Sequence, residues 1–587
     1  MSTKSNITLA GLGLISAGAS LGYLFRRRLY ERTLDLPPAY FAVSVHHNVP
    51  LTMPDGVQLA TDIYLPQAKR PLPTILMRTP YGRSGTSGGA MVFISHRLAE
   101  RGYNVVCQDV RGRFDSGGGE FEPFLHEQQD GLATLDWIAR QRWSDETVGM
   151  WGPSYLGYVQ WAAAVAELER GRPPILRAMM PLVAQTDMVD QSENGPNLDT
   201  VLRWMFILDL LTDKSKSDLQ RVVGIFAVKG QNRKLANGFN HLPITSADEA
   251  VLGRPVEFFR TWADHFEQEN DPYLEQVNLK RYVNQVSPPV HLCGGWYDIF
   301  ISGMLDDFVR LQAAGKRPFL TIGGWHHFSF GDQLHTLNDA LAWFDAYLKR
   351  DRRGLRQKPV RLQLMGSDEW RDYDSWPPPH TIRPYYLQGS GSDKNGRLAP
   401  TTPLRQDLPD RYIYDPADPT PNFGGPLLSA AAGPTDNREL EARPDVLVFT
   451  SPPLTADLDV IGHVRARLYV QSSAISADFF ARLCAVDENG RSLNVCDGLL
   501  RLKPGVGEPQ PDGSFCIEID MAATAYRFPA GHSLRLQVSS GAHPRYGRNF
   551  GTCDPILTCT RLVPATQSLY HDAAHPSALF IPIAQEA

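Results

Sequence analysis

Short runs of apolar residues recur along the first part of this 587-residue chain and restrict the folds that it can adopt. Runs with so few polar positions are typical of strands that helices cover on both faces. Between the second and third runs, apolar residues recur at helical spacing, so strand and helix alternate. The sequence therefore predicts an α/β fold. The runs are TILMR (74–78), YNVVCQDV (103–110), VGMWG (148–152), RAMMPLV (177–183), VHLCGGWYD (290–298) and FLTIGGWHH (319–327).

In two later regions the alternation of strand-like and helical stretches stops. Between residues 184 and 285 the strand-like runs stop and helical periodicity replaces them, which predicts a helical cap inserted into the α/β domain. After residue 355 proline is frequent and apolar residues alternate with polar ones, which predicts an all-β domain of the jelly-roll type. We expect an N-terminal segment and linker at 1–36, an α/β domain in two parts at 37–183 and 286–354, the cap at 184–285 and the β domain at 355–587.

The N-terminus differs in character from the rest of the chain. Residues 7–25 contain no charged side chain and end against three arginines, and a helix needs roughly 20 such residues to span a bilayer. We favour an uncleaved single-pass anchor over a cleaved export signal with Lys4 in front and a small-residue box at 17–19, because the apolar run continues past that box. The protein is therefore expected to be membrane-associated through residues 7–25, or exported if the segment is cleaved. The sequence does not decide which side of the membrane the rest of the chain faces.

Composition excludes two classes of function. The formal net charge is −6, and no dense basic stripe follows the N-terminus, so we expect no nucleic-acid partner. The seven cysteines are scattered, without the close pairs of a zinc site, and we interpret them mostly as buried thiols, with one or two bridges if the protein is exported. The histidine pairs at 46–47 and 326–327 lack the helical context of a catalytic metal site, so we expect no metal.

One serine lies where an apolar run gives way to a helical pattern. Ser154 follows Gly152 by two residues and precedes Gly157 by three. A nucleophilic serine on a strand-to-helix turn needs small neighbours, because the backbone and the helix leave little room. Leu156 occupies the second glycine position of the usual Gly-x-Ser-x-Gly pattern, and a Gly-x-Ser turn alone is more often a plain turn. The assignment therefore depends on partners elsewhere.

Those partners occur in the order that α/β hydrolases use. A serine hydroxyl needs a neutral imidazole to take its proton and a carboxylate to orient that imidazole. Asp298 ends one apolar run and His327 ends the next, which gives Ser154, Asp298 and His327 the order and strand-end positions of a catalytic triad. Taken alone, Asp298 fits the cap of a helix equally well. Taken alone, His327 fits a histidine that only bonds loop carbonyls. Their joint order favours a triad.

An oxyanion that forms during acyl transfer needs hydrogen-bond donors. The backbone N–H of Tyr155, directly after the serine, is one candidate. The second should follow the first apolar run, where the hydroxyl of Tyr81 is available, although this stretch is equally a packed turn.

Five motifs occur in a fixed order, namely RTPYGR, DVRGRFDSGGGEF, GPSYLG, GGWYDIF and GGWHH. With them the chain resembles the CocE/NonD family of serine hydrolases, which includes cocaine esterase, X-prolyl dipeptidyl aminopeptidases and α-amino-acid ester hydrolases. The resemblance covers nearly all of the chain after the N-terminal segment. It implies an α/β-hydrolase fold with a cap and a C-terminal jelly roll. It also implies Ser154 as nucleophile, Asp298 as acid, His327 as base, and Tyr81 with the Tyr155 N–H as oxyanion hole.

The expected function is hydrolysis of an ester, amide or peptide substrate through an acyl-enzyme, with no cofactor. The alternatives are an X-Pro dipeptidyl-peptidase and, from a different class, a membrane-tethered non-catalytic binding protein. The glycine-rich stretch 110–121 lacks the Gly-Lys-Ser/Thr ending of a phosphate loop, and we expect Arg111, Arg113 and Asp115 to form internal ion pairs there. The sequence indicates no oligomeric state.

Overall fold

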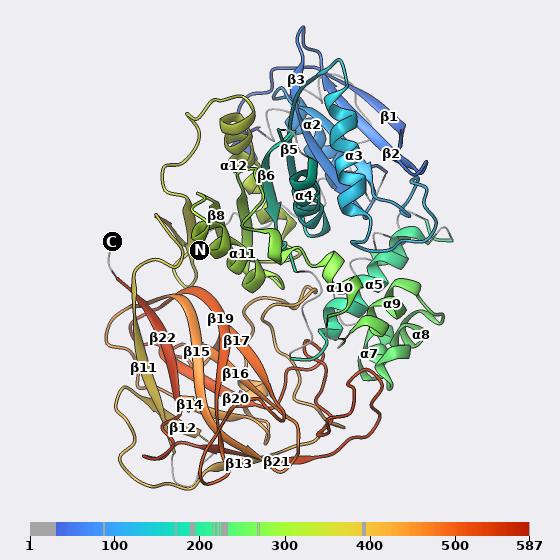
Figure 1. Ribbon diagram of the computed structural model, residues 1–587. Helices are drawn as coiled ribbons and strands as arrows, with labels where there is room; N and C mark the ends of the chain where they lie inside the picture. Colours follow the sequence, from blue (N-terminus) through green and yellow to red (C-terminus); the bar gives the residue numbers. More distant parts are fainter. Residues whose placement is uncertain are drawn as a thin grey trace.

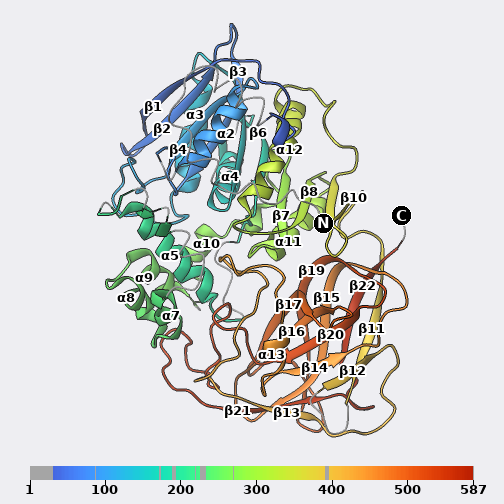
Figure 2. The same cartoon turned by 180° about the vertical axis from the view of Figure 1, so that it is seen from behind.

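The computed structural model describes residues 31–585 apart from 86–87, 171–172, 188–193, 214, 218–219, 222, 225–232, 267, 269 and 390–394. An α/β domain, a group of helices beside it and a domain of β-strands lie against one another (Figures 1 and 2). The helices interrupt the α/β domain in sequence, and the β domain follows it. The fold is therefore the predicted α/β-hydrolase domain with helical insertions, followed by a largely antiparallel β domain.

A ten-stranded mixed sheet forms the centre of the α/β domain, in the order β1-β2-β4-β3-β5-β6-β7-β8-β9-β10. The six apolar runs form β3 to β8, which pair in parallel, as burial on both faces predicts. The outer strands β1, β2 and β10 pair antiparallel. The strands are β1 Val43–Thr52, β2 Gln58–Pro66, β3 Leu72–Thr79, β4 Asn104–Asp109, β5 Ser144–Pro153, β6 Leu176–Leu182, β7 His291–Tyr297, β8 Phe319–His326, β9 Val360–Leu364 and β10 Glu369–Tyr373.

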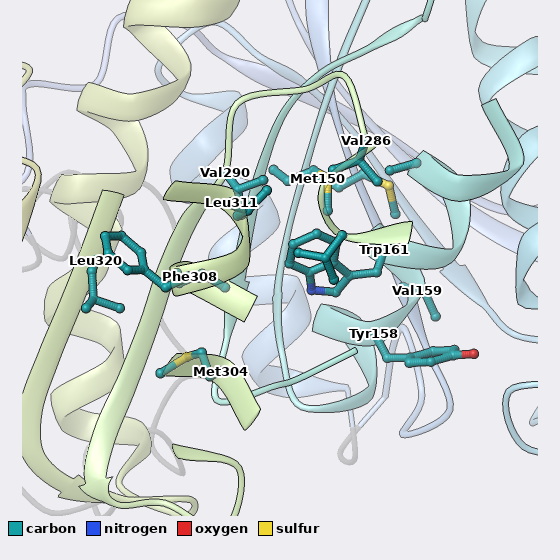
Figure 3. Packing of buried hydrophobic residues seen from close by; sticks show 14 of the residues in the cluster. Met150, Tyr158, Val159, Trp161, Val286, Val290, Met304, Phe308, Leu311 and Leu320 are labelled. Carbon is teal, nitrogen blue, oxygen red and sulfur yellow. The ribbon is translucent and has the colours of Figure 1, made fainter. Parts of the chain in front are cut away.

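Helices cover this sheet on both faces. Neighbouring residues of one strand belong to different apolar clusters: Met150 packs with α3, α4 and α11, whereas Trp151 packs with α2 and α12. Figure 3 shows part of the first cluster, with Trp161 of α4 at its centre. This packing fixes the start of α4 against the end of β5. The helices are α2 Gly89–Ala99, α3 Glu127–Ala139, α4 Tyr155–Ala166, α11 Ile301–Ala313 and α12 Phe330–Leu348.

A group of helices lies between the α/β and β domains at one side of the molecule, drawn in green in Figure 1. Asn197 caps the first of them by accepting a hydrogen bond from the Thr200 N–H. The helices are α5 Leu198–Thr212, α7 Arg233–Asn240, α8 Ala247–Leu252, α9 Glu257–His265 and α10 Pro272–Val277, and they fall in the range 184–285 expected for the cap. Short 3-10 turns occupy Glu167–Arg170, Ile244–Ser246 and Lys280–Tyr282.

The C-terminal strands form a hydrogen-bonded path in the order β13-β21-β15-β22-β11-β12-β14-β20-β16-β17, with β19 beside β15 and β18 beside β19. Their inward residues make a separate apolar core, as the alternating pattern predicts. The elements are β11 His380–Gln388, β12 Asn395–Ala399, β13 Asp410–Tyr414, α13 Arg438–Glu441, β14 Leu447–Thr450, β15 Leu458–Ser472, β16 Ala477–Val486, β17 Ser492–Leu502, β18 Glu508–Pro509, β19 Phe515–Phe528, β20 Ser533–Ser539, β21 Ala565–Tyr570 and β22 Ala578–Ala584.

The expected start of the β domain at residue 355 differs from the strand pairing. The strands β9 and β10 extend the first sheet rather than the second. In β9 buried residues alternate with half-buried ones, because this strand lies near the edge of the sheet. The boundary at 355 was predicted from the rise in proline content and the loss of helical pattern, and neither feature shows with which sheet a strand pairs.

The segment expected as an anchor, 7–25, lies outside the described residues. Within the described part of the chain, no helix has both the length and the apolar character needed to span a membrane. All seven cysteines are free, and only Cys516 and Cys553 are not buried. Five of the seven are therefore buried thiols, and the bridges considered for an exported protein are not formed.

Candidate active site

The turn between β5 and α4 holds Ser154 in a strained conformation. Its φ is +58° and its ψ is −124°, a combination that residues with a Cβ rarely adopt. Its N–H donates to the Leu182 carbonyl at 2.8 Å, and its own carbonyl accepts from the Gly157 N–H at 2.7 Å. These bonds fix the turn to the neighbouring strand and to the helix. The strain is the kind that a nucleophile elbow stores.

The shifted glycine has a steric explanation. A Cβ at position 157 would overlap the side chain of Ala184, where α4 approaches the chain that follows β6. At Gly152, where φ is +152°, a Cβ would overlap Leu156. The second glycine is therefore needed where the helix passes the neighbouring chain, one residue later than the usual pattern places it.

The structure brings Ser154, Asp298 and His327 together at the ends of three strands. Nε2 of His327 lies 3.1 Å from the Ser154 hydroxyl oxygen, and its Nδ1 lies 2.8 Å from Oδ2 of Asp298. The Phe300 N–H donates to Oδ1 of Asp298 at 2.8 Å, which fixes the carboxylate. Asp298 is 1% exposed and His327 is 5% exposed. The imidazole can therefore take the serine proton while its other N–H donates to the carboxylate.

Tyr81 also lies beside the serine hydroxyl. Its hydroxyl is 3.4 Å from that of Ser154 and accepts a hydrogen bond from the Trp204 indole N–H at 3.2 Å. Burial raises the pKa of Tyr81, partly offset by its contacts with Ser154, Trp204, Arg113 and the Tyr155 backbone. The Tyr81 phenol therefore stays protonated at neutral pH, and it meets the Tyr155 N–H beside the serine. These are the two donors that the sequence proposes for an oxyanion.

The arginines of the glycine-rich stretch serve different purposes. Arg111 and Asp115 form ion pairs as expected. Arg113 instead donates to two carbonyls, those of Pro80 at 2.9 Å and Leu208 at 3.1 Å. Burial lowers the pKa of Arg113 to about 10, so the guanidinium is still a cation at neutral pH. Sequence reasoning missed this because carbonyl acceptors leave no signature in the residue types.

An apolar cavity of about 330 Å³ opens in front of the serine. The α/β domain contributes Tyr81 and Phe124 to its walls, the helical group contributes Trp204 and Phe258, and the β domain contributes Leu428. The described lining residues include no aspartate, glutamate, lysine or arginine. Over the same described chain, no cluster of three or more histidine, cysteine, aspartate or glutamate side chains is placed to hold a metal.

Four of these lining residues were missed by sequence reasoning, namely Phe124, Trp204, Phe258 and Leu428. Trp204 looks like an ordinary core position of a helix, and its hydrogen bond to Tyr81 spans 123 positions. Leu428 has no local signal, and its place depends on its N–H, which donates to Asp199 at 3.2 Å. Contacts of such long range follow from tertiary packing alone.

Comparison with known proteins gives matches over almost the whole chain. The sequence model of the X-Pro dipeptidyl-peptidase (S15 family) matches residues 55–329, and that of the X-Pro dipeptidyl-peptidase C-terminal non-catalytic domain matches residues 354–579. Cocaine esterase from Rhodococcus sp. strain MB1 Bresler is 33% identical over 92% of this chain and 98% of its own length.

Two solved structures share the fold over the same extent. An aminopeptidase from a marine sediment Thaumarchaeota archaeon is 24% identical, with a TM-score of 0.76 over 93% of this chain and 97% of its own. An α-amino acid ester hydrolase is 22% identical, with a TM-score of 0.76 over 92% and 96%. At these identities the two structures establish the fold alone.

Proposed function

We propose that this chain, which belongs to the S15 family of CocE/NonD serine hydrolases, cleaves carboxylic esters with a hydrophobic acyl group, using Ser154 as the nucleophile. The observation that carries the proposal is the continuous chain from the serine hydroxyl through His327 to Asp298, at 3.1 Å and 2.8 Å, beside an apolar cavity. Family membership establishes a serine hydrolase. The apolar cavity supports the proposal that the substrate is an ester with a hydrophobic acyl group.

The residues suggest the following sequence of steps. The Ser154 oxygen attacks the carbonyl carbon while Nε2 of His327 takes its proton. The Tyr81 hydroxyl and the Tyr155 N–H stabilise the oxyanion, and Asp298 stabilises the imidazolium. His327 then gives the proton to the leaving-group oxygen, and the C–O bond breaks. Water attacks the acyl-enzyme with His327 again taking the proton, which releases the carboxylic acid and restores the serine.

The walls of the cavity favour a neutral acyl group. An X-Pro dipeptide or an α-amino acyl group carries an ammonium, and burying that charge without a carboxylate partner is costly. The described lining residues offer no carboxylate, whereas they include several aromatic rings. Two aspartates follow β6 in the sequence: Asp187 is buried and is not among the described lining residues, and Asp190 lies outside the described residues. We therefore place X-Pro dipeptidyl-peptidase activity second.

The test measures turnover of p-nitrophenyl butyrate and of Gly-Pro-p-nitroanilide by the full chain and by Ser154→Ala. We expect ester turnover that falls by about 10⁴-fold or more in Ser154→Ala, with an unchanged melting temperature. Faster cleavage of Gly-Pro-p-nitroanilide would support the dipeptidyl-peptidase alternative. Equal ester turnover by both proteins would support the non-catalytic binding protein.

A further inference from the structure

Tyr155 presents two different groups to its surroundings. Its backbone N–H faces the reaction site, while its side chain is fully buried behind the nucleophile turn. The phenol hydroxyl donates to Oε1 of Glu127 at 2.7 Å and accepts from the Phe124 N–H at 2.8 Å. The same residue that offers an oxyanion donor therefore also holds part of the backbone of the cavity wall.

Phe124 needs such a restraint. Its φ is +71°, in the left-handed region that residues other than glycine rarely occupy, at a typical cost of about 1 kcal/mol or more. Its ring lies nearly parallel to that of Tyr155, at 4.9 Å and 22°, and to that of Trp204, at 5.9 Å and 15°. The strained backbone is therefore what places this ring in the wall of the cavity, in a stack of three aromatic side chains.

A buried ion pair sets the direction of the tyrosine hydrogen bond. Oε2 of Glu127 lies 2.5 Å from Nη1 of Arg78, and both side chains are buried. A carboxylate only accepts, so the Tyr155 hydrogen points to Glu127 and leaves a lone pair for the Phe124 N–H. Burial, followed by the charge of Glu127, raises the pKa of Tyr155 well above its usual value. The phenol therefore keeps its hydrogen at neutral pH.

The rings of Phe124 and Trp204 line the cavity next to Tyr155, whereas other rings lie next to His327. His327 must reach the leaving-group oxygen, and the rings packed against it are those of Phe300, at 5.5 Å, and Phe328, at 5.8 Å. The rings packed against Tyr155 are those of Phe124 and Trp204. Since the leaving group departs toward the imidazole, the acyl group lies beside the second set.

We infer that the Tyr155 phenol is a positioning residue for acyl selectivity: it holds Phe124 in its left-handed conformation, so that the Phe124 ring forms the wall that contacts an aromatic acyl group. This inference rests on the proposed ester hydrolase. It adds no chemical step, because the phenol exchanges no proton with the substrate. Removing the hydroxyl would take away the partner of the Phe124 N–H and of Oε1 of Glu127, and the strained backbone would relax.

The helix itself offers a matched control. Tyr158, three residues later, is also fully buried, and its hydroxyl donates to the Val277 carbonyl at 2.8 Å. Its ring contacts Phe124 edge-on at 4.7 Å, and Figure 3 shows it at the border of the apolar cluster. Tyr155→Phe and Tyr158→Phe each remove one buried hydroxyl from the same helix. Only the first removes the bond that holds Phe124.

The experiment compares kcat/KM for p-nitrophenyl benzoate and p-nitrophenyl acetate, which share a leaving group. We expect Tyr155→Phe to lower the benzoate-to-acetate ratio by about 10-fold and Tyr158→Phe to leave the ratio unchanged. An unchanged ratio in Tyr155→Phe, or an equal fall in both variants, would overturn the inference. Acetate turnover that depends on Ser154 tests the proposed function separately.

A double-mutant cycle with Phe124→Ala tests the route of the effect. If Tyr155 acts through the ring, Phe124→Ala alone lowers the ratio, and adding Tyr155→Phe changes it no further. Additive effects would overturn the inference. Should Tyr155→Phe fail to fold, an unchanged ratio in Phe124→Ala would overturn it just as well.

Discussion

Two carboxylates are buried on either side of the nucleophile turn, and their partners differ. Asp298 accepts a hydrogen bond from Nδ1 of His327 at 2.8 Å. Glu127 pairs with the guanidinium of Arg78 at 2.5 Å and accepts from the Tyr155 hydroxyl at 2.7 Å. The first partner gains and loses a proton during the proposed reaction, whereas the second keeps its charge throughout.

This difference separates a carboxylate that acts in the chemistry from one that supports the site. An imidazolium that forms in the transition state is stabilised by Asp298 only at that moment, so the interaction lowers the barrier. The pair between Glu127 and Arg78 is the same in every state, so it stabilises the fold and the cavity wall instead. Removing each charge should therefore affect different measurements.

Asp298→Asn should have the largest effect on turnover. The amide keeps the shape of the side chain but cannot hold the imidazole in the required tautomer, so we expect kcat for p-nitrophenyl butyrate to fall by about 10⁴-fold. The melting temperature should change little. A loss below about 10-fold would remove the distinction drawn between the two carboxylates.

Tyr81→Phe should rank second. It removes one of two oxyanion donors and keeps the ring, so we expect kcat to fall by about 10² to 10³-fold with KM nearly unchanged. Steady-state kinetics with p-nitrophenyl acetate measure both constants. A rise in KM with constant kcat would instead assign Tyr81 to ground-state binding.

Glu127→Gln should lower the stability of the fold more than turnover, which is the opposite of the effect expected for Asp298→Asn. It removes the nearer of the two counter-charges of the buried Arg78 cation, the other being Asp130 at 3.8 Å, and we expect a loss of up to about 3–5 kcal/mol in the free energy of unfolding. Acetate turnover per folded molecule should fall by less than about 10-fold. Urea unfolding and active-site titration separate the two quantities, and an unchanged stability would contradict the supporting role.

The smallest expected effect is on the pH dependence of stability, and it concerns a third buried carboxylate, that of Asp307. Asp307 accepts from the N–H and the hydroxyl of Thr186, at 2.9 Å and 2.5 Å, and burial raises its pKa to about 7. The folded state then binds a proton between about pH 4 and 7 that the unfolded state does not, so this group makes the protein more stable as the pH falls through that window. The effect concerns stability and should leave turnover unchanged.

Asp307→Asn tests this sign. We measure the melting temperatures of variant and parent from pH 8 to pH 4. The difference, variant minus parent, should be more negative at pH 4 than at pH 8, because the variant lacks the extra bound proton. Parallel curves would show that Asp307 titrates normally in the folded protein.

Much of the site follows from the sequence because its members lie at the ends of strands. Ser154, Asp298 and His327 each follow an apolar run, and parallel strands bring their carboxyl ends to one edge of a sheet. The strands β9 and β10 follow residue 355 and were assigned to the β domain, although they pair with the first sheet. A local pattern indicates a strand but does not identify its neighbour.

The order of strands and helices, the glycines of the turn and the three polar residues at strand ends follow from local sequence, because periodicity and steric need act within a few residues. Three contacts depend on tertiary packing instead: Trp204 donates to Tyr81, Leu428 reaches the cavity, and Tyr155 holds Phe124. These contacts join segments that the chain leaves far apart, and they form only where the packed domains leave no other place for the side chains.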